Sequence, residues 1–278
     1  MIKIFERRNI IIFIILLITT LVYIFPIYWM FITSITPLQE ILGYPTTFWP
    51  KHPTAEAYIN NFIRNRTILP YFKNSFIIGL GTSVLTLCCA APAAYAMARF
   101  RLKGQMGINI FLLTTQMLPA IMLAMPIFIL FSYFNLVNSY IALILANATL
   151  AMPFAILNLR PYFLALPKGI EESALIDGCN RFSAFLLIIL PLVMPGLLTI
   201  GIITFLWGWG DFTFALILTT SEEVRPISMG LYKFIGQFGK EWDKLLAVAL
   251  VATLPIIILF IAFQKYIVSG LTSGAIKE

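Results

Sequence analysis

Long apolar stretches alternate with short polar segments along almost the whole chain. Six of them are long enough to cross the roughly 30 Å hydrocarbon layer of a bilayer as helices, which takes about 20 residues. They cover residues 10–32, 76–98, 107–131, 140–159, 184–207 and 245–268. The pattern predicts an all-α polytopic membrane protein with six transmembrane helices, which places both termini on one side of the membrane.

The composition agrees with a membrane protein and excludes a soluble globular domain. Of the 278 residues, 60% are hydrophobic and only 11% are charged, far from the balance of soluble chains. The net charge of +7 requires no nucleic acid, because anionic lipids of an inner leaflet attract basic segments. We therefore expect a lipid bilayer as a partner, and no nucleic acid.

Lysine and arginine predict the orientation, because cationic residues are retained on the cytoplasmic face. If the N-terminus is inside, the inner segments hold 11 of the 19 Lys and Arg, and the other eight are spread over two long outer loops, where charge matters less. The inner cations are Lys3, Arg7, Arg8, Arg99, Arg101, Lys103, Arg160, Lys168, Arg181, Lys265 and Lys277. We expect cytoplasmic termini and a cytoplasmic segment 160–183.

The first apolar stretch resembles a signal peptide, because three basic residues precede it. It continues past Pro26, however, and no small-residue cleavage site follows. We interpret it as an uncleaved helix with Tyr28 and Trp29 as an interfacial anchor on the outer side. The long outer loop that follows is either a lid over the outer mouth or a docking surface for an external protein.

Segment 160–183 is the most distinctive polar interruption, and its centre predicts a short helix of about two turns. Pro167 and Gly169 break the preceding structure, and Glu171 and Glu172 fall in a first turn, where the helix dipole favours anions. Gly178 stands where a left-handed terminating residue is expected. A helix this short needs a docking partner to be stable.

The same region carries a family resemblance. The motif residues are Glu172, Ser173 and Ala174, then Ile176, Asp177 and Gly178, and then Leu190 and Pro191 at the start of a span. They resemble the EAA loop of ABC importer permeases. The stretches NSFIIG, AAYAMARFRLKG, LPKGIEESALIDG and QKYIVSGLTSGAIKE narrow the resemblance to carbohydrate-type permeases related to the MalG subunit of the maltose transporter. Ser173 departs from the usual first alanine of the motif, and it is small enough to keep the packing.

The resemblance implies a type I ABC importer permease fold, a multi-pass location in the cell membrane, and the import of a sugar, either an oligosaccharide or a related polyol. It implies an N-terminal helix and outer loop over 1–71, a permease core over 72–264 and a cytoplasmic tail over 265–278. The implied partners are a second, MalF-like permease subunit, two copies of an ATPase and an external sugar-binding protein. Residues 171–178 and Pro191 would couple the chain to the ATPase.

Catalysis by this chain is not expected. No G-x-x-x-x-G-K-[ST] phosphate loop is present, and the single histidine, His52, allows neither a serine–histidine–acid triad nor a metal cluster. The adjacent Cys88 and Cys89 with the distant Cys179 do not form a disulfide framework. ATP and Mg²⁺ are therefore expected on the partner ATPase, and no cofactor in this chain.

Several polar residues in or near the spans are candidates for a translocation path. They are Gln116, Asn147, Asn158, Trp209 and Asp211. Asn147 and Asn158 are 11 residues apart and so share a helix face. Gln116 could instead serve helix packing. Trp207 and Trp209 are typical of an interfacial belt. Asp211 is either a solvated helix end or a polar contact in the path.

Two remaining features bear on function. Six small Ala residues at 90–98 favour close packing with a neighbouring helix, and Arg99, Arg101 and Lys103 form an inner loop open to lipid or the ATPase. The alternative function, an ion-coupled secondary transporter or channel, predicts ionisable residues in the middle of the spans, and these are almost absent. A membrane scaffold without transport activity gives no reason for the motif.

Overall fold

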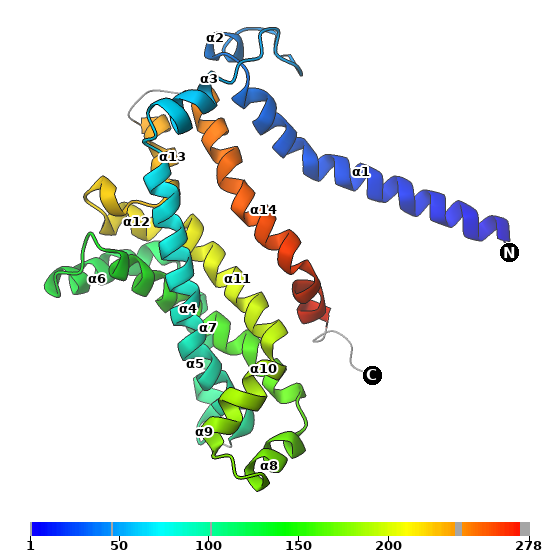
Figure 1. The fold of residues 1–278 in the computed structure, drawn as a ribbon, viewed down its shortest axis with the longest axis vertical. Coiled ribbons are helices and arrows are strands. Elements are labelled where there is room, and N and C mark those ends of the chain that lie inside the picture. The colour runs from blue at the N-terminus through cyan, green and yellow to red at the C-terminus, as the bar shows by residue number, and fades with distance from the viewer. Residues whose placement is uncertain (1, 46, 101, 237–240, 273–278) are drawn as a thin grey trace. The chain divides into compact units, whose positions relative to one another are not determined.

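The computed structural model describes residues 2–45, 47–100, 102–236 and 241–272, and at 2–8, 236 and 266–272 it describes only the backbone. In this part of the chain every regular element is helical (Figure 1). The chain divides into two compact units. Unit 1 comprises 1–69 and 231–255, and unit 2 comprises 70–230 and 256–278.

The long helices lie where the apolar stretches predict them. Four qualify as membrane spans, within α1 (Ile2–Ser34), α4 (Leu69–Arg99), α7 (Tyr140–Ala165) and α14 (Trp242–Thr272). The described residues thus contain four candidate spans, or six if each of two bent helix pairs counts as one. The span predicted over 140–159 is shorter than the observed helix, since α7 continues to Ala165. Leu159 and Phe163 are fully buried on α7, and this packing extends the helix beyond the apolar stretch.

The span predicted over 107–131 is not one continuous helix. Helix α5 (Gln105–Gln116) and helix α6 (Ala120–Tyr133) meet at an angle of 97°. Pro119 caps α6 in an extended conformation, and the ring of a proline disfavours helical geometry at the preceding residue. Pro119 therefore marks a break between two helices.

The predicted span over 184–207 is also divided. Helix α9 (Arg181–Ala184), the π-helix η2 (Phe185–Ile189) and helix α10 (Leu190–Leu192) form one limb, and α11 (Met194–Gly210) forms the other at 78°. Pro191 and Pro195 stand on the two sides of this bend. The wide π turn ends at Ile189, two residues before Pro191, which has no N–H for the helical ladder.

Shorter elements complete the described chain. In unit 1 these are α2 (Leu38–Ile41), α3 (Glu56–Tyr58), the π-helix η1 (Ile59–Arg64) and the end of α13 (Ile227–Gly236). In unit 2 they are α8 (Lys168–Ile176), α12 (Thr213–Leu218), the 3-10 turn η3 (Glu222–Val224) and the start of α13.

Glycines set the spacing between α4 and α11 in unit 2. A Cβ on Gly208 would lie 2.8 Å from Thr82 Oγ1 and 2.9 Å from the Cα of Gly79. The Ser83 and Ser75 hydroxyls donate to backbone carbonyls of the facing helix at 2.8 and 2.9 Å. Small residues and interhelical hydrogen bonds of this kind drive helix association in lipid.

Replacing Gly208 with alanine is therefore expected to push α4 and α11 apart and destabilise the protein by about 1–3 kcal/mol, the usual effect of overpacking. Gly210 is the matched control, because a Cβ there meets nothing within 4 Å. The apparent melting temperature of each variant in detergent measures the effect. Equal melting temperatures for the two variants would contradict the close crossing.

Candidate functional site

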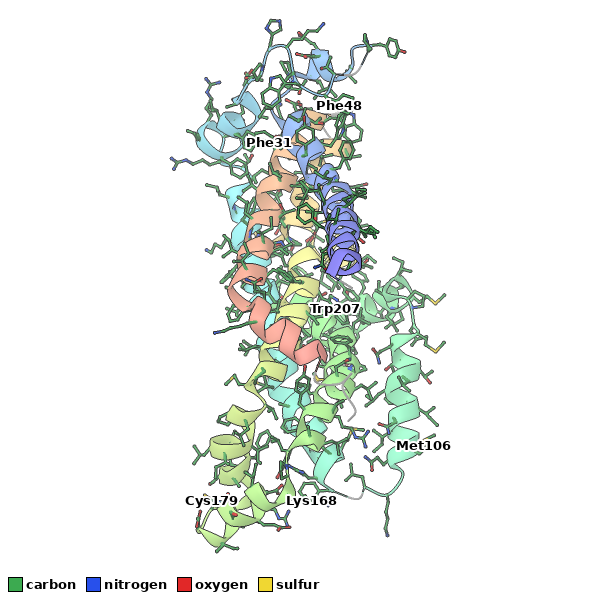
Figure 2. The ribbon with its side chains drawn as sticks, turned by 90° about the vertical axis from the view of Figure 1, so that its right-hand side faces the viewer. Phe31, Phe48, Met106, Lys168, Cys179 and Trp207 are labelled. Carbon is green, nitrogen blue, oxygen red and sulfur yellow. The ribbon has the colours of Figure 1, made fainter. Side chains whose placement is uncertain are left out.

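The predicted short helix in the polar segment is present as α8, with Pro167 as its N-cap. It lies at one end of unit 2 beyond α10 and α11 (Figure 1), and Figure 2 labels its first residue, Lys168, and Cys179, which follows its C-terminal cap. Its nine residues make about two and a half turns, as the sequence predicts.

One face of α8 packs against the protein. Glu171 and Ala174 are 7% and 2% exposed, and Ile170 and Leu175 are half-buried. Ile170, Ala174 and Leu175 form the apolar part of this face, at the spacing of an amphipathic helix. Burial of a carboxylate on the same face needs a separate explanation, because an ionised group is rarely buried without partners.

The partners of Glu171 come from the end of α4. The Tyr95 hydroxyl donates to Glu171 Oε1 at 2.6 Å, and Arg99 Nε lies 3.4 Å from Oε2. The side chains of Arg99 and Glu171 are only 5% and 9% exposed. We call Tyr95, Arg99 and Glu171 the α8 anchor. Arg181 adds little, because it is 65% exposed and its Nη1 is 3.9 Å away.

Arg99 also fixes the start of the segment. Its Nη2 donates to the backbone carbonyl of Leu166 at 3.0 Å, just before α8 begins. The sequence assigns Arg99 to an inner loop open to lipid or the ATPase, and this is wrong: the guanidinium is buried between α4 and the α8 segment. A buried charge paired on one side and hydrogen-bonded on the other is the arrangement that burial of an ion requires.

The opposite face of α8 has no packing partner among the described residues of unit 2. Gly169, Glu172, Ser173 and Ile176 are all exposed, and Ile176 is 84% exposed. At 100° per residue these four positions lie along one side of the helix. We call them the docking face. It presents one large apolar side chain beside two small residues and one carboxylate.

A Schellman cap ends α8. Gly178 has φ +91°, its N–H donates to Leu175 O at 3.2 Å, and the N–H of Cys179 donates to Ala174 O at 3.0 Å. This 6→1 and 5→2 pair satisfies the last carbonyls of the helix. The predicted left-handed residue at Gly178 is confirmed, and Asp177 is the C-cap.

Gly178 is required for its backbone conformation and not for space, because a Cβ there meets nothing within 4 Å. Gly178→Ala should weaken the cap by about 1–2 kcal/mol and lower transport, whereas Gly178→Asn should retain more, because Asn adopts positive φ more readily. Gly104→Ala is the control: Gly104 has φ +80° and open space outside α8. Equal uptake by Gly178→Ala and Gly104→Ala would contradict a special role for the cap.

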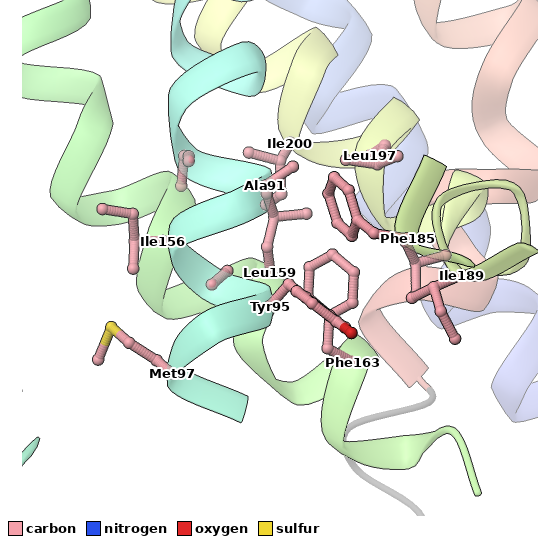
Figure 3. Packing of buried hydrophobic residues seen from close by; sticks show 14 of the residues in the cluster. Ala91, Tyr95, Met97, Ile156, Leu159, Phe163, Phe185, Ile189, Leu197 and Ile200 are labelled. Carbon is pink, nitrogen blue, oxygen red and sulfur yellow. The ribbon is translucent and has the colours of Figure 1, made fainter. Parts of the chain in front are cut away.

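The helix is linked to the bent span through the core of unit 2. The rings of Tyr95, Phe163 and Phe185 pack together, with centroids 4.9 to 6.3 Å apart, and Ile189 belongs to the same buried cluster (Figure 3). Phe185 and Ile189 lie on η2, directly before the exposed Pro191. A continuous set of packed side chains thus connects the α8 anchor to the bend ahead of α11.

Two of the predicted path residues meet. Asn147 Nδ2 donates to Asp211 Oδ2 at 3.2 Å, and the Asp211 carboxylate also accepts from the N–H groups of Phe214 and Ala215. Asp211 thus joins α7 to the start of α12. Asp211 does stand at a helix end, as the C-cap of α11, but its carboxylate is held by hydrogen bonds between these elements.

The other path candidates lie apart from this pair. Trp209 is 4% exposed, stacked on Phe205 and edge-on to Phe72, so its assignment to an interfacial belt is wrong; Trp207 is 41% exposed. Gln116 is exposed at the end of α5. Asn158 is exposed and donates to Phe154 O of its own helix, although it shares the face of Asn147 by period.

Sequence reasoning missed Tyr95 and Arg99. Tyr95 stands in a run of alanines that indicates helix packing, and Arg99 resembles one of three loop cations. Two signals were available in the sequence. Tyr95 and Arg99 are four residues apart and so share a helix face, and the Glu171 carboxylate lies in a short amphipathic helix that needs a partner.

Comparison with known proteins identifies relatives over nearly the whole chain. The model of the family "Binding-protein-dependent transport system inner membrane component" matches residues 89–273. The sulfoquinovosyl glycerol transport system permease protein SmoH of Agrobacterium fabrum is 34% identical over 91% of this chain and 89% of its own. The trehalose/maltose transport system permease protein MalG of Thermococcus litoralis is 35% identical over 92% of both.

A solved structure shares the fold. A chain of a bacterial ABC transporter involved in the import of the acidic polysaccharide alginate superposes with a TM-score of 0.78, over 94% of this chain and 96% of that one, at 22% identity. The matches confirm the resemblance to carbohydrate-type permeases.

Proposed function

Because this chain belongs to the family of binding-protein-dependent transport system inner membrane components, we propose that it is the membrane-spanning permease of an ABC importer that translocates a sugar. A family of transport permeases is not one of enzymes. The energy then comes from the hydrolysis of ATP, which is bound with Mg²⁺ on a separate subunit.

The observation that carries this proposal is the construction of α8. Its inner face is fixed to α4 by a buried ion pair and a hydrogen bond, while its docking face is left exposed. A helix of nine residues is too short to be stable without partners. Because its inner face is fixed to α4, a second protein that binds the docking face could move α8 as a rigid unit. We assign that second protein as the ATPase, with Glu171 to Gly178 as the coupling helix.

Transmission follows the packed path from α8 to the bend. Closure of the ATPase on nucleotide would move the docking face, and the Tyr95, Phe163 and Phe185 rings would pass the displacement to η2. Close-packed interiors transmit such shifts as rigid bodies. The bend after Pro191 then redirects the motion into α11, whose far end carries Trp209 and Asp211.

The proposed topology counts each bent pair as one span. Six spans with the N-terminus inside place both termini and α8 in the cytoplasm, as the distribution of Lys and Arg favours. The α8 end of unit 2 carries Lys168 and Arg181, which agrees with this orientation. The chain would then be a multi-pass protein of the cell membrane.

The proposed assembly contains this chain, a second MalF-like permease subunit, two copies of the ATPase and an external sugar-binding protein. The sugar class is supported by the names of relatives: trehalose and maltose for one, sulfoquinovosyl glycerol for another. The Asn147 and Asp211 pair is our candidate for a polar contact in the path.

Uptake in proteoliposomes tests the proposal. With the binding protein outside and ATP enclosed on the α8 side, a labelled oligosaccharide should accumulate, and a proton or sodium gradient alone should have no effect. Removing Mg²⁺ should stop uptake. Accumulation driven by a gradient without ATP would instead support the ion-coupled transporter.

A further inference from the structure

A further cavity is lined by residues of unit 1, the unit that does not include α8. Its volume is about 400 Å³, within the range of small-molecule sites. Its lining includes Trp29, Thr33 and Thr36 from α1 and the residues just after it, Glu40 from α2, and Trp242 from the start of α14. We call it the outer pocket.

The outer pocket stands at a membrane surface. The candidate span in α1 ends at Ser34, and the one in α14 begins at Trp242, so the pocket lies where both enter water. In the proposed topology this is the outer surface, and the inference rests on the proposed function in that respect. The surrounding loop is ordered by hydrogen bonds, from Thr54 N to Ile35 O at 2.8 Å and between Ser34 Oγ and the Tyr58 hydroxyl at 2.6 Å.

The polar groups of the pocket are mainly acceptors. The hydroxyls of Thr33 and Thr36 donate their protons to the carbonyls of Trp29 and Ile32, which leaves their oxygen lone pairs. The Glu40 carboxylate accepts from the backbone N–H of Lys51 at 2.6 Å, which fixes its position, and an ionised carboxylate has further acceptor sites. A ligand that matches these groups must supply several hydroxyl donors.

The charge and the aromatic content narrow the ligand further. Of the described residues that line the pocket, Glu40 alone is ionisable, so none of them is a cation that could pair with a lipid phosphate or another anion. Two indole side chains line the same space, and such rings offer a large apolar face to a ligand. A neutral polyhydroxylated ring compound has both the apolar faces and the hydroxyl donors.

We propose that the outer pocket is an accessory binding site for a neutral saccharide at the outer membrane surface, formed by residues other than the candidate path residues. Trp29 and Trp242 supply the stacking surface, and Glu40 orients the ligand by accepting from its hydroxyls.

Isothermal titration of the assembled transporter in nanodiscs tests the proposal, with maltose, trehalose and diacetylchitobiose as probes and without ATP or binding protein. We expect saturable binding of at least one probe, a loss of ten-fold or more in affinity for Trp242→Ala, and a smaller loss for Glu40→Gln. Trp49→Ala is the matched control, because Trp49 lies in the same loop, is 60% exposed and does not line the pocket.

The possible outcomes separate this site from the proposed function. Binding that is unchanged in both Trp242→Ala and Glu40→Gln, or lipid retained in the pocket with no saccharide binding, would overturn the site even if ATP still drives uptake. Saccharide binding that depends on Trp242, in a protein that never accumulates sugar with ATP, would support the site and overturn the proposed function. Size-exclusion profiles show whether Trp242→Ala fails to fold. In that case the saccharide affinity of Glu40→Gln decides whether the outer pocket binds the saccharide.

Discussion

Glu171→Ala is expected to abolish ATP-driven uptake while the chain still inserts into the membrane. The substitution leaves the Arg99 guanidinium buried without its counter-ion and the Tyr95 hydroxyl without its acceptor. Removing one partner of a buried pair costs about 3–5 kcal/mol, more than a helix of nine residues can recover by itself. Helix α8 should then lose its fixed position, and movement of the ATPase should no longer be transmitted to the permease. Uptake and the ATPase activity of the purified complex measure the loss.

Two further variants distinguish the α8 anchor from a general effect of charge on α8. Lys168→Ala removes a charge outside the anchor from the same helix and should retain uptake. The double variant Glu171→Leu with Arg99→Met removes both charges together, and a matched apolar pair can be close to neutral for stability; it should recover part of the activity that Glu171→Ala loses. Full uptake by Glu171→Ala alone would show that the anchor is not needed.

Ile176→Glu is expected to separate the permease from its ATPase without changing the permease fold. Ile176 is 84% exposed, so its replacement removes no internal packing. If its side chain is buried at the proposed interface, losing that burial costs about 1.5–3 kcal/mol, a roughly ten- to hundred-fold weaker association. The amount of ATPase that co-purifies, at a set of ATPase concentrations, measures this.

Ile176→Leu keeps the apolar side chain and should associate nearly as well as the original protein. Comparable melting temperatures for both variants would confirm that the fold is intact. If Ile176→Glu retains the ATPase at full strength, the docking face lies elsewhere on the molecule.

The sequence predicts α8 well because its limits are local. Pro167 and Gly178 act on the backbone at their own positions, and the spacing of Ile170, Ala174 and Leu175 marks the buried face. The α8 anchor is different in kind. Tyr95 and Glu171 are 76 residues apart, and nothing in either local pattern states that the two segments meet.

The bent spans show a second limit. Hydropathy reports the length of an apolar stretch but not its direction, so the pattern over 107–131 predicts one helix where there are two. Proline is an ambiguous sign in a membrane: Pro119 stands at a break of 97°, whereas Pro92 and Pro153 lie inside continuous helices. Neighbouring groups can satisfy the freed carbonyl in one place and not in another, and that depends on tertiary packing.

The path residues illustrate the same point. Helical period places Asn147 and Asn158 on one face, but it does not tell how far along that face a neighbouring element extends. Asn147 meets Asp211, and Asn158 remains exposed. Trp209 likewise has the position of a belt residue in the sequence and the burial of a core residue in the structure.

Cross-linking from the docking face tests the central claim most directly. The variant Ser173→Cys, in a chain whose Cys88, Cys89 and Cys179 are replaced by serine, carries a photoactivatable maleimide on the exposed side of α8. We expect adducts with the ATPase subunit, and labelling of the introduced thiol by a membrane-impermeant reagent only from the cytoplasmic side. Labelling from the outer side, or illumination of the assembled complex that yields no adduct with the ATPase, would contradict the assignment of α8 as the coupling helix.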